Sequence, residues 1–276
     1  MKMTEPAKIC VLITGASSGI GAGLAREFSR RGMRVALVAR RIAQLEVLAG
    51  ELRAAGAQAS AHCGDVTVDG DIARVVGELS ALGVAPHIVI ANAGFGVVGN
   101  AANLDLADYR RQFETNVFGV LRTIQVGLEA LKRSKGTLVL IGSVSSYISA
   151  PEASAYSMSK FAVRALAEAL RAELARDGVS VVLITPGFVK SQIRQVDNQG
   201  EYRSSAKDPI PEWMQMSAEN AAKKIAKAVL KKKRERVITF HGKVFVLLQR
   251  FFPGLSAWFF KRAGKKFRSR NPSLNA

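Results

Sequence analysis

A tyrosine and a lysine stand four residues apart, at Tyr156 and Lys160, in segment 154–177, whose apolar spacing predicts a helix. That spacing puts both side chains on one helix face. A phenol with a pKa of ~10 exchanges protons poorly at neutral pH, and a neighbouring ammonium favours the phenolate. The pair thus predicts a tyrosine acid/base if other site residues join it, because this spacing alone is more often an exposed helix face.

Ser143 follows the apolar run Thr137–Ile141, which predicts a buried strand. Ligands of open α/β sheets gather at the carboxyl ends of strands, so we expect the Ser143 hydroxyl to hold a substrate carbonyl or alcohol oxygen. Ser143 lacks the Gly-x-Ser-x-Gly elbow of a hydrolase nucleophile. His62, His87 and His241 are scattered, which predicts no metal site and places each histidine at a strand end or on the surface.

Glycines follow the first apolar run, Ile9–Ile13, in the order Thr14-Gly15-Ala16-Ser17-Ser18-Gly19-Ile20-Gly21, and a helical segment to Arg31 comes next. Glycines at a strand-to-helix turn let the backbone approach a pyrophosphate, which the helix N-terminus attracts. The spacing differs from Gly-x-Gly-x-x-Gly, and a simple tight turn is the alternative. The strand before and the helix after favour dinucleotide binding.

Arg40 and Arg41 follow the second apolar run, Val35–Ala39, where an acidic residue would select a free ribose 2′-hydroxyl. Two guanidinium groups can instead clamp a 2′-phosphate. A solvated helix start is the alternative, but cations are disfavoured at a helix N-terminus, so this pair calls for an anion. The sequence therefore favours NADP over NAD.

Short apolar runs alternate with helical segments along the chain. The runs are 9–13, 35–39, 57–61, 87–91, 137–141, 179–185 and 236–240, and the clearest helical segments are 20–31, 42–55, 105–133 and 154–177. Alternation of this kind predicts βαβ units and a doubly wound α/β domain with helices on both faces of a parallel sheet. We expect one domain over 1–242 and an extension over 243–276.

Composition agrees with a globular chain. The 276 residues are 48% hydrophobic and 22% charged, which excludes wholesale disorder. Cys10 and Cys63 form no C-x-x-C pair and are predicted to be buried small hydrophobes. The first residues lack the apolar stretch of a signal peptide, and no run of 18 apolar residues is free of charge and proline, so a cytoplasmic location is expected.

The formal charge of +18 is concentrated near the C-terminus. Residues 223–276 hold 16 Lys or Arg and one acid, for a net +15, whereas residues 1–222 carry a net +3. Helical steps align Val244, Leu247, Leu248, Phe251, Phe252, Leu255, Trp258 and Phe259 in one stripe, opposite Gln249, Arg250 and Ser256, with a break expected at Pro253-Gly254.

An apolar stripe between basic clusters is typical of a segment lying on an anionic membrane surface. The alternatives are packing on the domain, lining the substrate pocket or forming an oligomer interface. Nucleic acid is disfavoured, because phosphate contacts need no apolar stripe. In segment 192–216, Trp213, Met214 and Met216 suit a lipophilic ligand or, equally, a helix packed on the sheet.

The motifs together resemble those of the short-chain dehydrogenase/reductase family over residues 8–240. They are Thr14-Gly-x-x-x-Gly-x-Gly21, Asn92-Ala93-Gly94, Asn116, Ser143, Tyr156-x-x-x-Lys160 and Pro186-Gly187, in the family's order and spacing. The resemblance implies a single Rossmann domain with a mostly parallel seven-stranded sheet and a homo-dimer or tetramer.

The resemblance also implies roles. Tyr156 would be the acid/base, and Lys160 would lower its pKa and bind the nicotinamide ribose. Ser143 would orient the substrate oxygen, and Asn116 would hold a water of a proton relay. The implied cofactor-binding residues are Gly15, Ser17, Ser18, Gly19, Ile20, Gly21, Arg40, Arg41, Asp65, Val66, Asn92, Ala93, Gly94, Tyr156, Lys160, Pro186, Gly187, Val189 and Ser191, the last standing where the family often has Thr.

The expected function is an NADP(H)-dependent oxidoreductase that interconverts a ketone and a secondary alcohol. Its substrate is expected to be lipophilic, such as a steroid, a long-chain 3-keto lipid or an acyl derivative, with peripheral docking at the inner face of the membrane through 243–276. The alternative is a nucleotide-sensing or membrane-scaffolding protein on the same fold that binds the cofactor without turnover.

Overall fold

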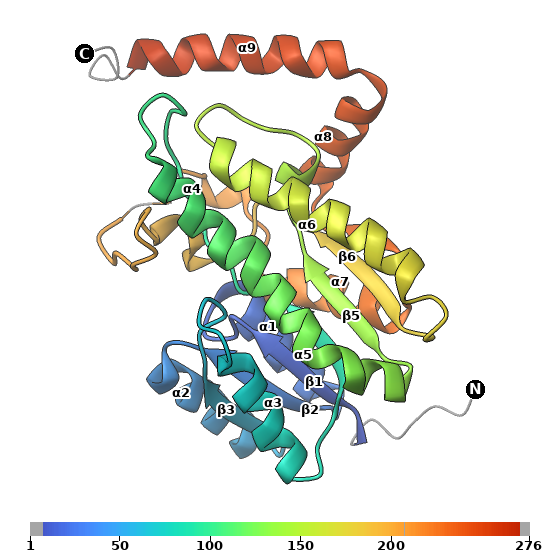
Figure 1. Cartoon of the computed structure of the whole chain (residues 1–276). Coiled ribbons are helices and arrows are strands. Elements are labelled where there is room, and N and C mark those ends of the chain that lie inside the picture. Colours follow the sequence, from blue (N-terminus) through green and yellow to red (C-terminus); the bar gives the residue numbers. More distant parts are fainter. Residues whose placement is uncertain (1–7, 207, 271–276) are drawn as a thin grey trace.

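The computed structural model describes residues 8–206 and 208–270, with the side chains of 263–270 left aside. Its centre is a seven-stranded sheet in the order β3-β2-β1-β4-β5-β6-β7, and every neighbouring pair is parallel (Figure 1). The strands are β1 (Cys10–Thr14), β2 (Arg34–Ala39), β3 (Ala59–Cys63), β4 (Pro86–Ala91), β5 (Thr137–Ile141), β6 (Ser180–Thr185) and β7 (Glu235–Val237).

Helices cover both faces of the sheet. The helices α1 (Gly19–Arg30), α2 (Ile42–Ala54) and α7 (Ala218–Leu230) pack on one face. The helices α3 (Asp71–Ala81), α5 (Gly119–Ser134) and α6 (Ser154–Glu173) pack on the other, and α4 (Leu106–Phe113) packs against α6. The predicted doubly wound α/β fold is therefore confirmed.

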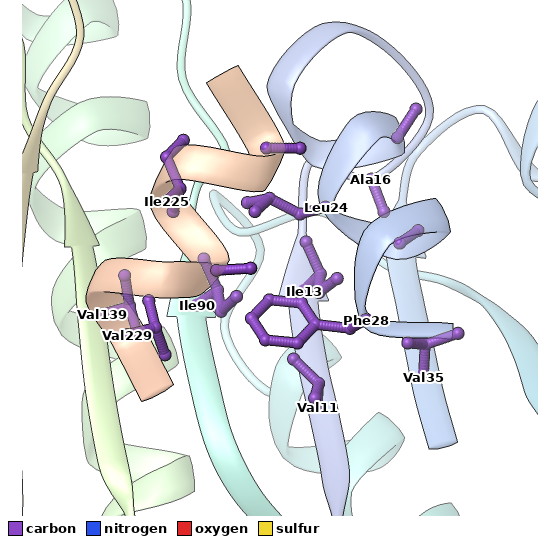
Figure 2. Packing of buried hydrophobic residues seen from close by; sticks show 14 of the residues in the cluster. Val11, Ile13, Ala16, Leu24, Phe28, Val35, Ile90, Val139, Ile225 and Val229 are labelled. Carbon is purple, nitrogen blue, oxygen red and sulfur yellow. The ribbon is translucent and has the colours of Figure 1, made fainter. Parts of the chain in front are cut away.

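Side chains of β1 show how the two apolar layers form. Val11 and Ile13 point to the α1 and α7 side, where Phe28 of α1 is fully buried (Figure 2). Their neighbours Cys10 and Leu12 join the opposite cluster, because successive side chains of a strand face opposite ways. Burial on both faces explains why the strands appear as continuous apolar runs.

Three predicted boundaries need correction. Segment 105–133 is not one helix, because the π-helical turn Glu114–Phe118 joins α4 to α5. The last strand ends at Val237 instead of Phe240, since the Thr239 hydroxyl accepts the Gly242 N–H (3.2 Å) and caps the next helix. The third strand lies at 59–63 instead of 57–61. Cys63, at the end of that edge strand, is exposed, so its predicted burial is wrong, whereas Cys10 is buried.

Two helices, α8 (Phe240–Phe251) and α9 (Pro253–Arg270), follow the sheet and run along the outside of the molecule (Figure 1). The predicted break at Pro253 is confirmed. All members of the predicted stripe except Leu248 are exposed, so packing on the domain is wrong for them. Ser256, on the opposite side of α9, is buried instead.

Candidate active site

One cleft of about 460 Å³ lies at the carboxyl ends of the strands, where the strand order reverses between β1 and β4. Open α/β sheets bind ligands at such a switch point. Of the predicted site residues, the lining includes Gly15, Ser17, Ser18, Ile20, Arg40, Arg41, Asp65, Val66, Asn92, Ala93, Gly94, Ser143, Tyr156, Lys160, Pro186, Gly187, Val189 and Ser191. Gly19, Gly21 and Asn116 are not among the lining residues of this cleft.

The glycine turn after β1 has a shape that side chains would block. Gly15 (φ +66°) and Gly19 (φ +54°) adopt left-handed backbone. A Cβ on Gly21 would stand 2.3 Å from the Gly15 carbonyl oxygen. The Asn92 amide holds the turn from β4, donating to the carbonyl oxygens of Thr14 (2.9 Å) and Gly15 (3.1 Å). The bare backbone at the start of α1 fits a pyrophosphate.

Two cations and two hydroxyls meet at the end of β2. The Arg41 guanidinium donates to Ser17 Oγ (3.1 Å) and Ser18 Oγ (3.3 Å). The Arg40 side chain is exposed, with Nη1 4.0 Å from a carboxylate oxygen of Asp65. Burial, and then the charge of Arg40, lower the pKa of Arg41. Hydrogen-bond donors and positive charge in this arrangement fit a phosphate.

Tyr156 and Lys160 lie one turn apart on α6, as predicted, and Lys160 Nζ is 5.7 Å from the centre of the Tyr156 ring. Lys160 is buried, donates to the Ile141 carbonyl oxygen (2.9 Å), and its burial lowers its pKa to about 8. Burial raises the pKa of Tyr156, opposed by a hydrogen bond with Ser143 and the charge of Arg194.

The expected lowering of the Tyr156 pKa by Lys160 is therefore not found. Burial is the largest cause acting on both groups, and the Lys160 ammonium donates its hydrogen bond to the Ile141 carbonyl oxygen of β5. A phenol with a raised pKa stays protonated at neutral pH and can donate a proton to an oxygen beside it.

Ser143 and Asn116 complete the predicted tetrad. Ser143 lies two residues after β5 and caps the 3-10 turn Val144–Ser146, its Oγ accepting the Ser145 N–H (3.1 Å). Asn116 is fully buried in the π-helical turn, where its amide donates to the Phe95 carbonyl oxygen (3.0 Å) and Ser159 Oγ (3.1 Å). A Cβ on Gly94 would be 2.9 Å from Asn116 Oδ1 and 3.7 Å from Lys160 Nζ. The lack of a side chain at Gly94 therefore leaves room for the side chains of Asn116 and Lys160.

Several side chains at the cleft have no counterpart in the predicted set. Gln192 accepts from Arg41 (3.1 Å), and the Tyr202 ring lies 5.9 Å from the Arg41 guanidinium. Arg194 pairs with Asp208 (2.7 Å) and also lines the cleft. All come from segment 192–208, whose sequence carries no motif. No local signal marks them, because long-range contacts place this segment over the cleft.

The predicted position of His241, at a strand end or on the surface, is wrong, because His241 is the second residue of α8. Its Nε2 accepts the Phe188 N–H (3.0 Å) directly behind Gly187, which lines the cleft. His87 accepts from the Cys10 N–H, and His62 contacts Glu78 and Ser60. Among the described residues no group of three or more His, Cys, Asp or Glu could hold a metal ion.

The Trp/Met segment fits neither predicted arrangement. Trp213 and Met214 lie in a three-residue 3-10 turn, Glu212–Met214, and Trp213 is 84% exposed. Met216 packs against the core beside Val189 instead of facing the cleft. The stripe of α8 and α9 contributes no lining residue either. Over the described part of the chain, no helix is both long and apolar enough to cross a membrane.

Comparisons with known proteins agree with this geometry. The short chain dehydrogenase family profile matches residues 9–202. An uncharacterized oxidoreductase of Myxococcus xanthus is 37% identical over 197 residues, which are 71% of this chain and 78% of that protein. The 11-beta-hydroxysteroid dehydrogenase 1A of Arabidopsis thaliana is 33% identical over 261 residues, 90% of this chain and 73% of that protein.

A solved structure extends the likeness to the fold. The short-chain dehydrogenase from Sphingobium yanoikuyae in complex with NADPH is 26% identical, has a TM-score of 0.74, and is matched over 90% of this chain and 95% of its own. Sequence, fold and cleft thus agree, and the chain belongs to the short-chain dehydrogenase/reductase family of oxidoreductases, which act on CH–OH and C=O groups with NAD(P) cofactors.

Proposed function

We propose that this protein is an NADP(H)-dependent oxidoreductase that interconverts a ketone and a secondary alcohol with Tyr156 as acid/base. The observation that carries the proposal is that Tyr156, Ser143 and Lys160 line the same cleft as the glycine turn, with Lys160 Nζ 5.7 Å from the centre of the Tyr156 ring. When bound, the cofactor supplies a hydride to the carbonyl carbon.

Four residues of the chain would bind the substrate, donate the proton and support the site. Ser143 holds the substrate oxygen beside Tyr156, which donates its proton to that oxygen as negative charge develops there. Lys160 binds the nicotinamide ribose and, with its charge, stabilises the phenolate that remains. Asn116, bonded to Phe95 and Ser159, fixes the π-helical turn behind Lys160 and supports the proposed proton relay.

For NADP over NAD, the support is the Arg40–Arg41 pair beside Ser17 and Ser18. The Arg41 guanidinium would bind a 2′-phosphate in the geometry that it now uses for hydroxyls and the Gln192 amide oxygen. Asp65 and Val66 would contact the adenine, and Pro186, Gly187, Val189 and Ser191 the nicotinamide end.

The sequence suggested a lipophilic substrate from the segment that contains Trp213, but Trp213 faces solvent. The proposal of a lipophilic substrate therefore rests on other residues. Phe95, Ile193 and Val196 line the cleft, and the similar Arabidopsis protein is a hydroxysteroid dehydrogenase. Arg194 lines the same cleft but is neutralised by Asp208. The test is NADPH oxidation with ketones of rising chain length and ring count, with NADH as the comparison; turnover with NADH alone would contradict the proposal.

We also propose a homo-oligomer formed through the catalytic domain, residues 1–242. Exposed apolar side chains gather on helices that pack together, namely Leu106 of α4, Phe118 of the π-helical turn and Met158 and Phe161 of α6. A patch of this kind on a soluble domain marks an interaction site. Light scattering should give at least a dimer, and Phe161→Glu should dissociate it; a wild-type monomer would contradict the proposal.

A further inference from the structure

The two C-terminal helices carry an apolar face that no described part of the protein covers. Phe240, Val244, Leu247 and Phe251 recur at steps of four, three and four, so they form one stripe along α8. The corner residue Phe252 and three side chains of α9 continue it. We call these eight side chains, all between 48% and 80% exposed, the apolar face: Phe240, Val244, Leu247, Phe251, Phe252, Leu255, Trp258 and Phe259.

Cations border this face. Lys243 and Arg250, seven residues apart, lie on the same flank of the α8 stripe and are exposed. Lys261 and Arg262 are exposed on α9, and the Arg262 guanidinium lies 4.6 Å from the centre of the Trp258 ring. Residues 236–276 contain nine Lys or Arg and no Asp or Glu. The partner of this surface must therefore be both apolar and anionic.

A second copy of the chain does not meet that requirement. A symmetric contact through the apolar face would bring the cations of one copy to those of the other, with no carboxylate in the segment to pair with them. An exposed apolar patch for self-association exists elsewhere, on α4 and α6. Nucleic acid offers phosphates but leaves eight apolar side chains without a partner.

We propose that α8 and α9 dock on an anionic lipid surface, with the apolar face inserted among the headgroups and the cations in contact with lipid phosphates. A helix of 12 residues spans about 18 Å, less than the ~30 Å of a bilayer core, so α8 lies in the interface instead of crossing it. Trp and Lys/Arg are the residue types that favour this depth.

This docking goes beyond the proposed reaction and has a consequence for it. His241, the second residue of α8, holds the Phe188 backbone beside Gly187 and Pro186, which line the cleft. Figure 1 shows α8 leading from the sheet to α9. Docking would therefore hold the cleft within about one helix length of the lipid from which a lipophilic ketone would come.

The test is co-sedimentation of the full-length protein with phosphatidylcholine vesicles and with phosphatidylcholine vesicles containing phosphatidylglycerol, without cofactor or substrate. Binding to the anionic vesicles is expected to exceed binding to the neutral ones at least tenfold and to fall as salt rises. Trp258→Ser should weaken it severalfold, whereas the control Trp213→Ser, at another exposed tryptophan, should leave it unchanged. Lys243→Gln with Arg250→Gln should weaken it about fivefold per cation, whereas Lys223→Gln with Lys224→Gln on α7 should have little effect.

Circular dichroism melts and NADPH fluorescence, measured on every variant, separate lost docking from lost folding. Equal partitioning of the wild type onto neutral and anionic vesicles, or unchanged binding by Trp258→Ser, would overturn the proposal. So would a wild-type oligomer that Trp258→Ser dissociates while vesicles are not bound, because a second copy would then cover the face. Vesicle binding is scored without turnover, so a failure of the proposed reaction leaves this test intact.

Discussion

The backbone N–H of Phe188 donates a 3.0 Å hydrogen bond to Nε2 of His241, and the two rings stack with centroids 5.0 Å apart. This contact joins the first turn of α8 to the segment after β6. A Cβ on Gly187 would lie 2.5 Å from the same Nε2 and 2.2 Å from Thr239 Oγ1, so the segment has no room to shift toward α8. The cleft and α8 therefore share one support.

Removal of the His241 acceptor should loosen that support. His241→Ala is expected to raise the KM for NADPH severalfold and to lower kcat, because the Pro186–Val189 segment loses both the hydrogen bond and the stacked ring. His241→Gln keeps an acceptor and should recover part of the loss. Steady-state kinetics with equal stability of the two variants checks this, and equal kinetics for both would argue for ring packing alone.

Burial of the same histidine should make the stability of the protein fall in acid. Burial lowers the pKa of His241 below its ordinary value, so the unfolded chain binds its proton more tightly than the folded chain. Its contribution to stability is present above the unfolded pKa of ~6.5 and is lost as pH falls through the folded pKa. Urea unfolding should show a smaller fall in stability below pH 6.5 for His241→Gln than for the wild type.

The buried charge of Lys160 should lower the stability of the folded protein, although the proposed reaction needs this residue. Its pKa is lowered to about 8 by burial, so its ionisation opposes folding by roughly 3 kcal/mol at neutral pH. Stability should therefore rise between pH 8 and 10.5, and this rise should be missing in Lys160→Met. We expect that variant to be inactive yet at least as stable as the wild type at pH 7; marked destabilisation would contradict the pKa.

Arg41 should determine the choice of nucleotide. Arg41→Ala is expected to raise the KM for NADPH roughly tenfold, because a charged hydrogen bond is lost. The KM for NADH should stay nearly unchanged. Arg53→Ala, an exposed arginine at the other end of α2, is the control. An equal effect on both nucleotides would mean that Arg41 binds a part that they share.

Gly21 should be irreplaceable where another helical glycine is not. Gly21→Ala places a Cβ 2.3 Å from the Gly15 carbonyl oxygen, so the turn must open and NADPH binding should fall at least tenfold. Gly50→Ala, in α2 with no atom within 4 Å of its Cβ, should keep binding and stabilise the helix by about 1 kcal/mol. Fluorescence titration with NADPH and thermal melts measure the two effects.

The sheet and the glycine turn could be predicted because their signals are local. Buried parallel strands are continuous apolar runs. The turn excludes side chains at Gly15, Gly19 and Gly21, so glycine stands at these positions and can be recognised in the sequence. The exposed apolar residues of α8 and α9 were likewise visible as a stripe, although the sequence did not show that Ser256 would be the buried side.

What could not be predicted depends on contacts between distant residues. Arg194 and Tyr202 line the cleft, and His241 supports the Phe188 backbone behind it, through the folding of segments that carry no motif. The π-helical turn at Asn116 depends on its amide bonding to Phe95, 21 residues earlier. The raised pKa of Tyr156 reflects its burial, which the spacing from Lys160 four residues away does not show.

The central claim is that Tyr156 moves the proton while the rest of the cleft binds the nucleotide, and one comparison tests it most directly. NADPH binding by fluorescence and ketone reduction by loss of NADPH absorbance are measured on the wild type and Tyr156→Phe. We expect the variant to bind NADPH within about twofold of the wild type and to lose reduction by a factor of 10²–10⁴. Undiminished reduction by Tyr156→Phe, or binding without turnover by the wild type on every ketone, would contradict it.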